Sequence, residues 1–529
     1  MSTPSRSVII HNPTGLVDLS AVSGCETLRP AGARRVGDVS TAEIQPAPTA
    51  ADVPELVVGF DLDMTLIDSR PGIQAVWDLL AAETGVPIDT DLVVSRLGPP
   101  LTWEMANWFP PEQVEPLIAR YRELYPSHAI TGSLPLPGVA ESLAAIRALR
   151  GRTMVVSAKY TPSVRLHLEH LGFDIDEPVG DLHGAEKGTA LREHEATIYV
   201  GDHTADIDGA HAAGALAVSV ATGPFTADEL RAYGADVVLN DLTEFPEWLE
   251  EYVLEQRLEA LMKRLSSYDK MVVAFSGGAD SAFLLAAAGR AIGPANVVAA
   301  TAISPSLPAA ELEPAARFAD TIGVRHVTPH THEMEREGYQ ANSGARCYFC
   351  KAELIETLQP IADEFGITAI ATGTNADDAI AGFRPGIRAA FERGALTPLR
   401  DARLTKSQIR TASRSWGLET SDKPAAACLS SRIAYGIRIT PNLLVRVDRA
   451  EQTVRARLAS YDVQNVRVRD LGESASIEID SDLLDRVDHQ ELVDAVIAEG
   501  FAAAQVDPRG FRSGSMNERL ADPEKYRSL

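Results

Sequence analysis

The chain has 529 residues and a formal net charge of −25, and this length favours about three domains, each large enough to enclose its own core. The negative charge argues against a protein that coats nucleic acid, because no basic patch is evident that would neutralise phosphates. Neither a charged-then-apolar leader nor an apolar run of about twenty residues occurs, so we expect no secretory signal, no membrane span and a cytoplasmic location.

The N-terminal residues 1–53 are rich in Ser, Thr, Pro, Ala and Gly and show no sustained hydrophobic period. Too little apolar surface is available there to offset the entropy lost on ordering, so we predict a disordered tail. The first globular domain is expected to begin at residue 54.

Two carboxylates follow the first strand-like run, which starts at Leu56. The sequence LVVGFDLDMTLIDS places Asp61 and Asp63 two residues apart, with Thr65 close behind. Side chains two apart on an extended segment point the same way, so both carboxylates can enter one site at the carboxyl end of the strand. The alternative is an acidic surface loop.

Further polar residues follow in order. A second strand-like run, TMVVS, ends at Ser157, Lys187 heads a helical segment, and a third run, TIYV, leads into Asp202 and Asp206. With these four elements the segment 54–249 resembles the haloacid dehalogenase (HAD) superfamily. Amphipathic stretches between the first two elements predict a helical cap at about residues 72–130 that closes over the substrate.

The resemblance to HAD enzymes implies a phosphatase. Asp61 would attack phosphorus to give an aspartyl phosphate, and Asp63 would serve as general acid and base. Thr65 or Ser157, together with Lys187, would hold the phosphoryl oxygens. The nature of the phosphate ester depends on the cap and cannot be read from these residues.

The metal implied for this domain is Mg²⁺, bound by Asp61, the Asp63 backbone and Asp202, with Asp206 in support. The cation and a lysine would neutralise charge before a carboxylate attacks a phosphate dianion. One position departs from the family: the residue after Asp63, commonly Gly, is Met64. Its bulky side chain is expected to narrow or reshape the mouth of the site.

The second half of the chain is organised around the stretch VVAFSGGADSAFLL. An apolar strand-like run passes into Ser276, Gly277, Gly278, Asp280 and Ser281 and then into a helical segment. The glycines let the backbone approach an anion, and the helix N-terminus presents free N–H groups. Because no Lys-Ser/Thr ending is present, this is not a Walker A loop. It resembles the PP-loop of enzymes that adenylate a carboxylate or carbonyl and release pyrophosphate.

Two later strand-like runs also end in polar groups suited to a nucleotide. Residues 297–302 lead to Ser304, and residues 367–371 lead to Thr374 and Asp377. Parallel strands place these groups at one edge of the sheet, so we predict that they bind ATP together with the PP-loop. A capped helix start is the alternative for the last of these segments and is compatible with ATP binding.

Three of the four cysteines lie in this half: Cys347 and Cys350 in RCYFCK, and Cys428 in KPAAACLSSR. In a reducing compartment this clustering suggests a metal or reactive-thiol site rather than disulfides. The CxxC pair alone would suit a zinc half-site, a redox pair or no function. Lys423 and Arg432 flank Cys428, and nearby cations raise the thiolate fraction, so Cys428 is a candidate nucleophile or metal ligand.

Arginines further along offer an anion site. Arg467 and Arg469 alternate with valines, so both guanidinium groups share one face of a strand and can bind a phosphate or carboxylate. A solvated strand face is the alternative. Arg512 lies in another Gly/Ser/Arg segment. We predict that these three residues and Arg432 bind substrate.

Taken in order, SGGADS, SPS, RCYFCK, GTNADD, KPAAACLSSRIAYG, RVR and GFRSGSMNE are similar to the LarE family of ATP-dependent sulfur transferases. The resemblance implies that ATP adenylates a carboxylate of a pyridinium dicarboxylate mononucleotide, the precursor of the nickel-pincer nucleotide cofactor, and that sulfur replaces AMP. Either Cys428 gives up its own sulfur, or Cys347, Cys350 and Cys428 hold a [4Fe–4S] cluster with an exchangeable sulfide. Since three cysteines are present, we favour the cluster.

The sequence therefore predicts an α/β protein with two doubly wound parallel-sheet domains, at residues 54–249 and 250–425, and a small α+β region at 426–529. We expect a HAD phosphatase fused to a sulfur transferase, with a nucleotide-like small molecule as substrate, nickel-pincer cofactor synthesis proteins or further copies of the chain as partners, and no nucleic acid. Two alternatives stay open. One is a PP-loop enzyme that thiolates tRNA or forms an amide, and the other is a scaffold with a non-catalytic HAD domain.

Overall fold

The computed structural model describes residues 53–380, 385–424, 427–512 and 514–519. The predicted disordered tail thus lies outside the described residues, except for its last position. Among the residues described, no helix combines the length and the apolar character needed to cross a bilayer.

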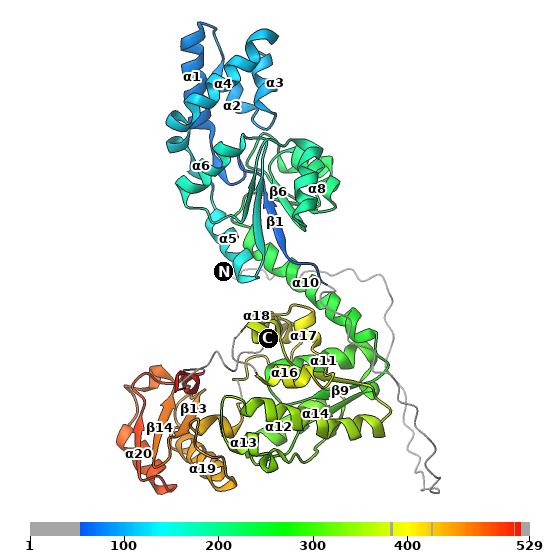
Figure 1. The fold of residues 1–529 in the computed structure, drawn as a ribbon, viewed down its shortest axis with the longest axis vertical. Helices are drawn as coiled ribbons and strands as arrows, with labels where there is room; N and C mark the ends of the chain where they lie inside the picture. The colour runs from blue at the N-terminus through cyan, green and yellow to red at the C-terminus, as the bar shows by residue number, and fades with distance from the viewer. Residues whose placement is uncertain (1–52, 381–384, 425–426, 513, 520–529) are drawn as a thin grey trace, which may run out of the picture. The chain divides into compact units, whose positions relative to one another are not determined.

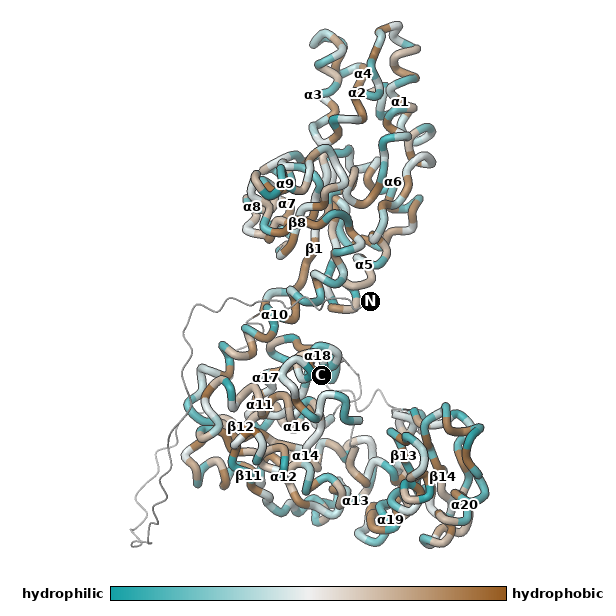
Figure 2. Tube along the Cα trace, turned by 180° about the vertical axis from the view of Figure 1, so that it is seen from behind, coloured by the Kyte–Doolittle hydropathy of each residue, from teal (hydrophilic) through white to brown (hydrophobic). Residues whose placement is uncertain are grey.

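The first sheet has six parallel strands in the order β5-β4-β1-β6-β7-β8. These are short apolar runs, mostly buried on both faces, as is typical of a parallel sheet covered by helices, and hydrophobic residues gather along them (Figure 2). Their bounds are β1 Val57–Phe60, β4 Arg152–Val156, β5 Glu177–Val179, β6 Ile198–Gly201, β7 Leu216–Val220 and β8 Val237–Leu239.

Helices cover both faces of this sheet (Figure 1). One face packs against α5 Val139–Ala148, α6 Thr161–Leu171 and the start of α10 Phe245–Ser266. The other packs against α7 Lys187–Glu193, α8 Thr204–Ala213 and α9 Ala227–Tyr233.

A helical layer with its own core is inserted after β1. It contains α1 Arg70–Thr84, α2 Thr90–Ser95, α3 Leu101–Ala106 and α4 Pro111–His128, which pack around Trp77. The antiparallel pair β2 Ile67–Asp68 and β3 Leu134–Pro135 lies where the chain enters and leaves this layer. We call these four helices the cap.

One uninterrupted helix, α10, crosses the domain boundary predicted at residues 249 and 250. Its first turns place Phe245, Leu249 and Val253 in the core of the first sheet, and its last turns place Leu261 and Leu265 in the next core. The stretch WLEEYVLEQRLEALMKRL contains no Gly or Pro. Because nothing in it stops a helix, the helix continues through the change of domain.

The second sheet has four parallel strands in the order β11-β10-β9-β12. These are β9 Met271–Ala274, β10 Val297–Ala300, β11 Arg325–Val327 and β12 Ala369–Thr372. One face packs against α11 Ala279–Ile292, α12 Leu312–Thr321, α17 Pro398–Asp401 and α18 Lys406–Ser415. The other packs against α14 Arg346–Glu364 and α16 Pro385–Phe391, and the short helices α13 Glu337–Gln340 and α15 Ala376–Ile380 lie in its loops.

A third, smaller sheet follows. In it β14 Ser474–Ile479 pairs antiparallel with β13 Val466–Asp470 and parallel with β15 Ala503–Val506. The helices α19 Pro441–Arg457 and α20 His489–Ala498 share its core. Two helix-covered parallel sheets, a helical cap and this small α+β unit confirm the predicted fold class.

Candidate active sites

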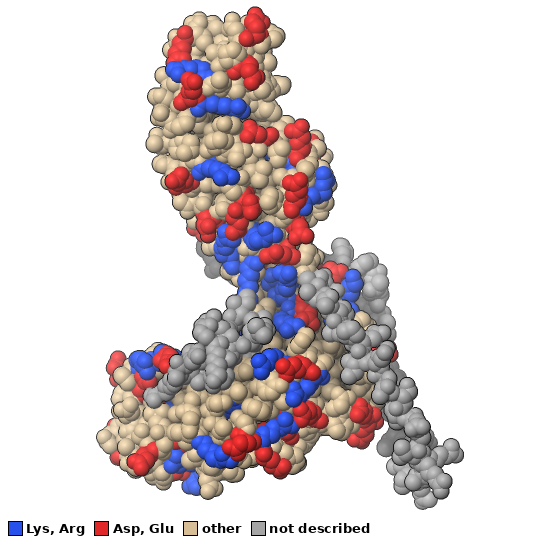
Figure 3. Space-filling model, in the orientation of Figure 1, with Lys and Arg blue, Asp and Glu red and all other residues tan. Residues whose placement is uncertain are grey.

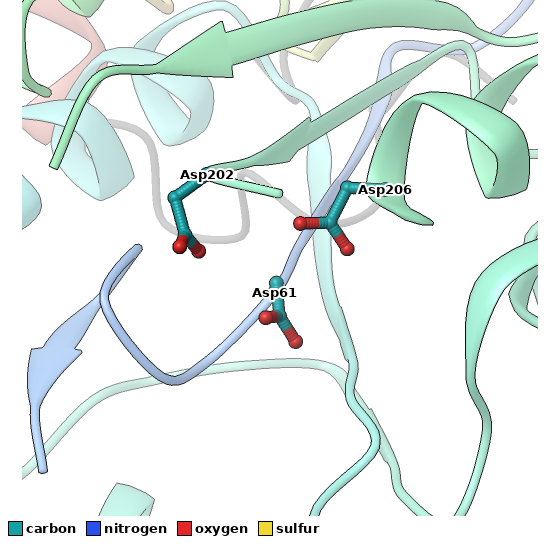
Figure 4. Close-up of side chains that lie close together, drawn as sticks. All are labelled: Asp61, Asp202 and Asp206. Carbon is teal, nitrogen blue, oxygen red and sulfur yellow. The ribbon is translucent and has the colours of Figure 1, made fainter. Parts of the chain in front are cut away.

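Three buried carboxylates meet at the carboxyl ends of β1 and β6. Asp61 follows β1, Asp202 follows β6, and Asp206 lies in the first turn of α8. They point toward one another (Figure 4), and one oxygen of each lies within 4.8 Å of the others. The parallel register of the two strands sets this arrangement, since Asp61 N donates to Val200 O at 2.8 Å. Asp61 is only 7% exposed, which rules out the surface-loop alternative.

Lys187, at the start of α7, is buried against the same carboxylates. Its Nζ lies 3.1 Å from Asp61 Oδ1 and donates to Asp206 Oδ1 at 2.6 Å and to the Tyr199 hydroxyl at 3.0 Å. Burial alone would lower the pKa of Lys187, but the charges of Asp206 and Asp61 outweigh it and hold the pKa above its ordinary value. The ammonium group therefore stays charged at the site.

A divalent cation fits the chemistry of this carboxylate set. Burial first, and then the charges of Asp206 and Asp61, raise the pKa of Asp202 well above its ordinary value. Asp61 Oδ1 is buried and accepts no hydrogen bond from any described residue. Carboxylate oxygens are the ligands that Mg²⁺ prefers, and a cation would supply the positive charge that one lysine cannot.

Thr65 and Ser157 follow the neighbouring parallel strands β1 and β4. Thr65 Oγ1 donates to Asp202 Oδ1 at 2.9 Å, so Thr65 orients a residue that is predicted to bind the metal. Ser157 is buried directly after β4, and its hydroxyl accepts from the backbone N–H of Lys159 at 3.3 Å. Thr65 and Lys187 thus contact the carboxylate set directly, whereas Ser157 lies at the end of the neighbouring strand β4.

Asp63 is held by a separate set of groups. Its Oδ1 accepts a hydrogen bond from Ser69 Oγ and lies 3.1 Å from Lys159 Nζ. Sequence reasoning missed Lys159. Its only signal is its place two residues after Ser157, where a lysine could equally have pointed into solvent.

The turn after Asp63 carries Met64 in a left-handed backbone conformation, with φ of 60°. Thr222 Oγ1 donates to the Met64 carbonyl at 2.5 Å, and the Met64 side chain is 5% exposed. The family's usual glycine would adopt this conformation without steric cost. The side chain is buried at the turn, and its effect on the mouth of the site remains a prediction.

The second site begins at the loop between β9 and α11. Gly277 has φ of 72°, a value that favours glycine. Ser276 N donates to Ser281 Oγ at 3.3 Å, Gly278 N donates to Ser276 Oγ at 3.4 Å, and Ser281 Oγ donates to Gly278 O at 3.1 Å. The loop is therefore closed by its own hydroxyls where α11 begins.

The end of β12 lies against this loop. A Cβ at Gly373 would sit 2.8 Å from Ser281 N, so only glycine allows the approach. Asn375 donates from Nδ2 to Asp280 Oδ2 at 3.1 Å, and burial raises the pKa of Asp280. Asp377 Oδ2 accepts from the N–H of Lys406, the first residue of α18, at 2.6 Å. The capped helix start considered as the alternative is present as well, because Asn375 Oδ1 accepts from Asp377 N at 2.9 Å at the start of α15.

Cys428 lies on a loop joined to the loop that follows β10. Leu429 N donates to Ser306 O at 2.8 Å, and Ser306 Oγ lies 2.8 Å from Ser304 Oγ. Cys428 Sγ lies 3.1 Å from Ser430 Oγ. The loop bearing the thiol and a loop predicted to bind ATP are therefore held together by a main-chain bond.

Cys347 and Cys350 lie in the first turns of α14. These two thiols and that of Cys428 are all free. Burial first, then the charges of Cys428, Glu333 and Cys347, raise the pKa of Cys350. Cys350 packs against the core that contains Leu429, the residue after Cys428.

The cations that flank Cys428 in sequence have other partners. Lys423 Nζ donates to Gly277 O at 2.9 Å and pairs with Glu311 at 2.6 Å, beside a cavity of about 190 Å³. Arg432 donates to Cys428 O at 3.0 Å, not to its sulfur. These contacts do not support the expectation that both cations act on the thiol.

Comparison with known proteins finds relatives for both halves of the chain. Residues 56–214 match the family model described as haloacid dehalogenase-like hydrolase. The pyridinium-3,5-bisthiocarboxylic acid mononucleotide synthase of Lactiplantibacillus plantarum is 30% identical over 274 residues, which are 50% of this chain and 96% of that protein. The chain belongs to the LarE family, with a HAD hydrolase domain fused to it.

Two further relatives extend the comparison. An uncharacterised protein of Synechocystis is 41% identical over 272 residues, which cover 51% of this chain and 99% of that protein. The tyrosine-protein kinase PtkA of Mycobacterium tuberculosis is 29% identical over 211 residues, which cover 37% of this chain and 72% of that protein. The predicted fusion of a HAD domain with a LarE-type domain is confirmed.

Three arginines of the LarE-family half are buried, and two of them have glutamate partners that sequence reasoning missed. Arg432 Nε donates to Glu451 Oε1 at 2.9 Å, and Arg469 Nη2 donates to Glu478 Oε2 at 2.7 Å. Arg467 is 6% exposed, and burial together with the charge of Arg432 lowers its pKa to about 10. The solvated-face alternative is therefore wrong for Arg467 and Arg469.

Arg512 differs from these three arginines. Its side chain is partly exposed and its Nη2 donates to Glu518 Oε2 at 3.2 Å. The neighbouring Ser515 Oγ accepts from Arg469 Nη2 at 3.1 Å and donates to Glu478 Oε1 at 2.9 Å. The segment after β15 thus reaches the buried arginine cluster through Ser515 rather than through Arg512.

Proposed function

We propose that the chain joins two enzymes: a Mg²⁺-dependent phosphatase in the HAD domain and an ATP-dependent sulfur transferase in the LarE-family half. The first half of the proposal is carried by one observation, the buried nucleophile Asp61 with Lys187 Nζ 3.1 Å away and three carboxylates converging. A non-catalytic scaffold has no need to bury three carboxylates beside a single ammonium group.

In the proposed phosphatase reaction, Asp61 attacks phosphorus and the bond from phosphorus to the leaving oxygen breaks. Asp63 gives that oxygen a proton, and then takes one from the water that attacks the aspartyl phosphate and frees Asp61. Lys187, Thr65 and Ser157 hold the phosphoryl oxygens. Asp61 and Asp202 would hold Mg²⁺, with the Asp63 backbone and Asp206 in support, and the ion would supply positive charge beside those oxygens.

Hydrolysis of p-nitrophenyl phosphate with Mg²⁺ tests this half. We expect Asp61→Asn to lose the activity to background, whereas Arg165→Met, which removes an exposed cation from α6, keeps it. A kinase is named among the relatives, so label from γ-labelled ATP is followed in parallel. Transfer of label to tyrosine without ester hydrolysis would contradict the phosphatase.

The sulfur transferase is supported by the bond between Leu429 N and Ser306 O, which joins the Cys428 loop to the loop after β10 that carries Ser304. In the proposed reaction a substrate carboxylate oxygen attacks the α-phosphorus of ATP and pyrophosphate leaves. Sulfur then attacks the acyl carbon and AMP leaves with the bonding electron pair. The PP-loop, Ser304, Thr374 and Asp377 hold ATP in this proposal.

The proposed substrate is a pyridinium dicarboxylate mononucleotide, after the product named for the Lactiplantibacillus relative. Its phosphate is proposed to contact the arginine cluster of Arg432, Arg467 and Arg469, with Arg512 at the margin. On the face shown in Figure 3 acidic and basic side chains are interspersed over the described residues. The formal net charge of −25 favours a small-molecule substrate over tRNA, which needs a basic surface.

The sulfur source divides the proposal into two testable forms. Three free thiols supply the ligands that a site-open iron–sulfur cluster needs; Cys347, Cys350 and Cys428 would hold it, and it would supply an exchangeable sulfide. Iron and sulfide are quantified after anaerobic purification, and Cys428 is weighed by mass spectrometry after incubation with ATP and substrate. Iron-free protein that transfers sulfur and leaves Cys428 lighter by hydrogen sulfide would overturn the cluster and establish the sacrificial route.

A further inference from the structure

A chain of buried polar contacts leads from Asp63 into the cap. Lys159 Nζ lies 3.1 Å from Asp63 Oδ1 and donates to the Tyr125 hydroxyl at 2.6 Å. That hydroxyl lies 3.0 Å from His167 Nε2. The Lys159 side chain is 8% exposed, and Tyr125 and His167 are buried.

The direction of these hydrogen bonds follows from the donors available. An ammonium group can only donate, so the Tyr125 oxygen accepts from Lys159 and its own hydrogen is available to His167 Nε2. That hydrogen bond requires the tautomer in which Nε2 is unprotonated. Burial, and then the charge of Lys159, lower the pKa of His167 to about 3, which agrees with a neutral ring.

The four groups come from different parts of the HAD domain. Asp63 follows β1, Lys159 follows β4, and His167 lies on α6, whereas Tyr125 lies on α4 of the cap. Burying an ammonium group beside carboxylates costs solvation that an apolar side chain would avoid. The buried ammonium group of Lys159 is therefore explained best by a function that requires a positive charge beside Asp63.

We propose that Lys159 is a positioning residue for Asp63, and that Tyr125 of the cap holds Lys159 in place. With Tyr125 against Lys159, Oδ1 of the Asp63 carboxyl is held by both Lys159 and Ser69, and Oδ2 is left for the proton. The carboxyl is then oriented so that its proton faces the leaving oxygen of the substrate. This inference rests on the proposed phosphatase function.

Two substrates of similar shape distinguish a role of Lys159 in positioning Asp63 from a role in stabilising the fold. p-Nitrophenolate leaves readily without a proton, whereas the phenolate of phenyl phosphate needs one. We expect Lys159→Met to lower kcat/KM for phenyl phosphate on the order of 10²-fold, the scale of general acid catalysis, and that for p-nitrophenyl phosphate by less than about 10-fold. Lys159→Arg should recover most of the loss, because it returns the charge.

Tyr125→Phe tests the contribution of the cap. The substitution removes the hydroxyl that holds Lys159 and keeps the ring. Its kcat/KM for phenyl phosphate should therefore fall more than that for p-nitrophenyl phosphate, as in Lys159→Met, but by a smaller factor. Arg165→Met on the exposed side of α6 serves as the control and should leave both substrates unaffected. Circular dichroism confirms that each variant is folded.

The outcomes are distinguishable. Equal losses for the two esters in Lys159→Met, or no recovery in Lys159→Arg, would overturn the positioning role while leaving the phosphatase intact. A wild-type chain that hydrolyses neither ester with Mg²⁺ would instead refute the phosphatase itself.

Discussion

At the scale of single residues, backbone strain and side-chain burial at Met64 have opposite effects on the stability of the fold. Its left-handed backbone costs about 1 kcal/mol in a residue with a Cβ, while burial of its side chain stabilises the turn by roughly 1.5–3 kcal/mol. The stabilisation from burial exceeds the backbone strain. We therefore expect Met64→Gly to lower the free energy of unfolding by about 1 kcal/mol, although glycine suits the backbone better.

Urea unfolding of Met64→Gly and Met64→Ala separates strain from burial. Alanine keeps the strained backbone and loses the burial, so it should be the less stable of the two by about 1 kcal/mol. A glycine variant more stable than the wild type would mean that strain, not burial, dominates this turn.

His167 predicts a pH dependence of stability. Its pKa falls from 6.5 to about 3 in the folded protein, so below pH 6.5 the unfolded chain binds a proton that the folded one does not. The stability contribution is complete above that pH and is lost as the pH falls toward 3, by about 1.4 kcal/mol per pH unit.

The comparison of wild type with His167→Gln isolates this group from other titrating residues. Glutamine keeps an acceptor for Tyr125 but does not titrate. Between pH 6.5 and pH 5 we expect the wild type to lose about 2 kcal/mol more than the variant, measured by urea unfolding. Parallel pH profiles for the two proteins would contradict the buried neutral imidazole.

Residues that follow a strand could be predicted from the sequence, whereas partners supplied by distant segments could not. Asp61 and Asp202 follow apolar runs, and parallel-sheet topology brings such positions together. Glu451 and Glu478 give no comparable signal, because a glutamate on a helix or strand is most often a solvated side chain. Their pairing with buried arginines appears only once α19 and β14 are packed.

At the scale of secondary structure elements, α10 connects the cores of the two parallel sheets without interruption. We expect Glu255→Pro, at an exposed position near its centre, to destabilise the chain by about 3 kcal/mol or more, because proline removes a helical hydrogen bond and clashes with the preceding turn. Glu255→Ala keeps the helix and should be close to neutral. Thermal unfolding followed by circular dichroism compares the two, and equal melting temperatures would show that the helix is dispensable there.

The same helix explains why the elements could be predicted from sequence only in part. Strands β1, β4, β6 and β9 match apolar runs because a parallel strand is buried on both faces. The boundary predicted at residues 249 and 250 rests on a change in composition, from an apolar strand to a charged stretch. A charged stretch of good helix formers continues a helix as readily as it begins one, so composition could not locate the junction.

At the scale of the whole molecule, the two proposed active sites share no catalytic residue. We expect Asp61→Asn to abolish ester hydrolysis and leave sulfur transfer within about twofold of the wild type, and Cys428→Ala to do the reverse. Phosphate release and thiocarboxylate formation are measured on the same preparations. A loss of both activities in either variant, with the fold intact by circular dichroism, would show that the two reactions are coupled.

The bond from Leu429 N to Ser306 O has a consequence for how this protein can change over evolutionary time. Both atoms belong to the main chain, so almost any side chain at either position leaves the bond in place, and only proline at residue 429 removes the donor. Selection at the two positions therefore acts on their packing rather than on this bond, since Leu429 is buried in the core of the small sheet and Ser306 Oγ donates to Glu333 Oε1 at 3.2 Å. Two loops proposed to serve one reaction can thus be joined by main-chain atoms alone, while the side chains at the junction pack elsewhere.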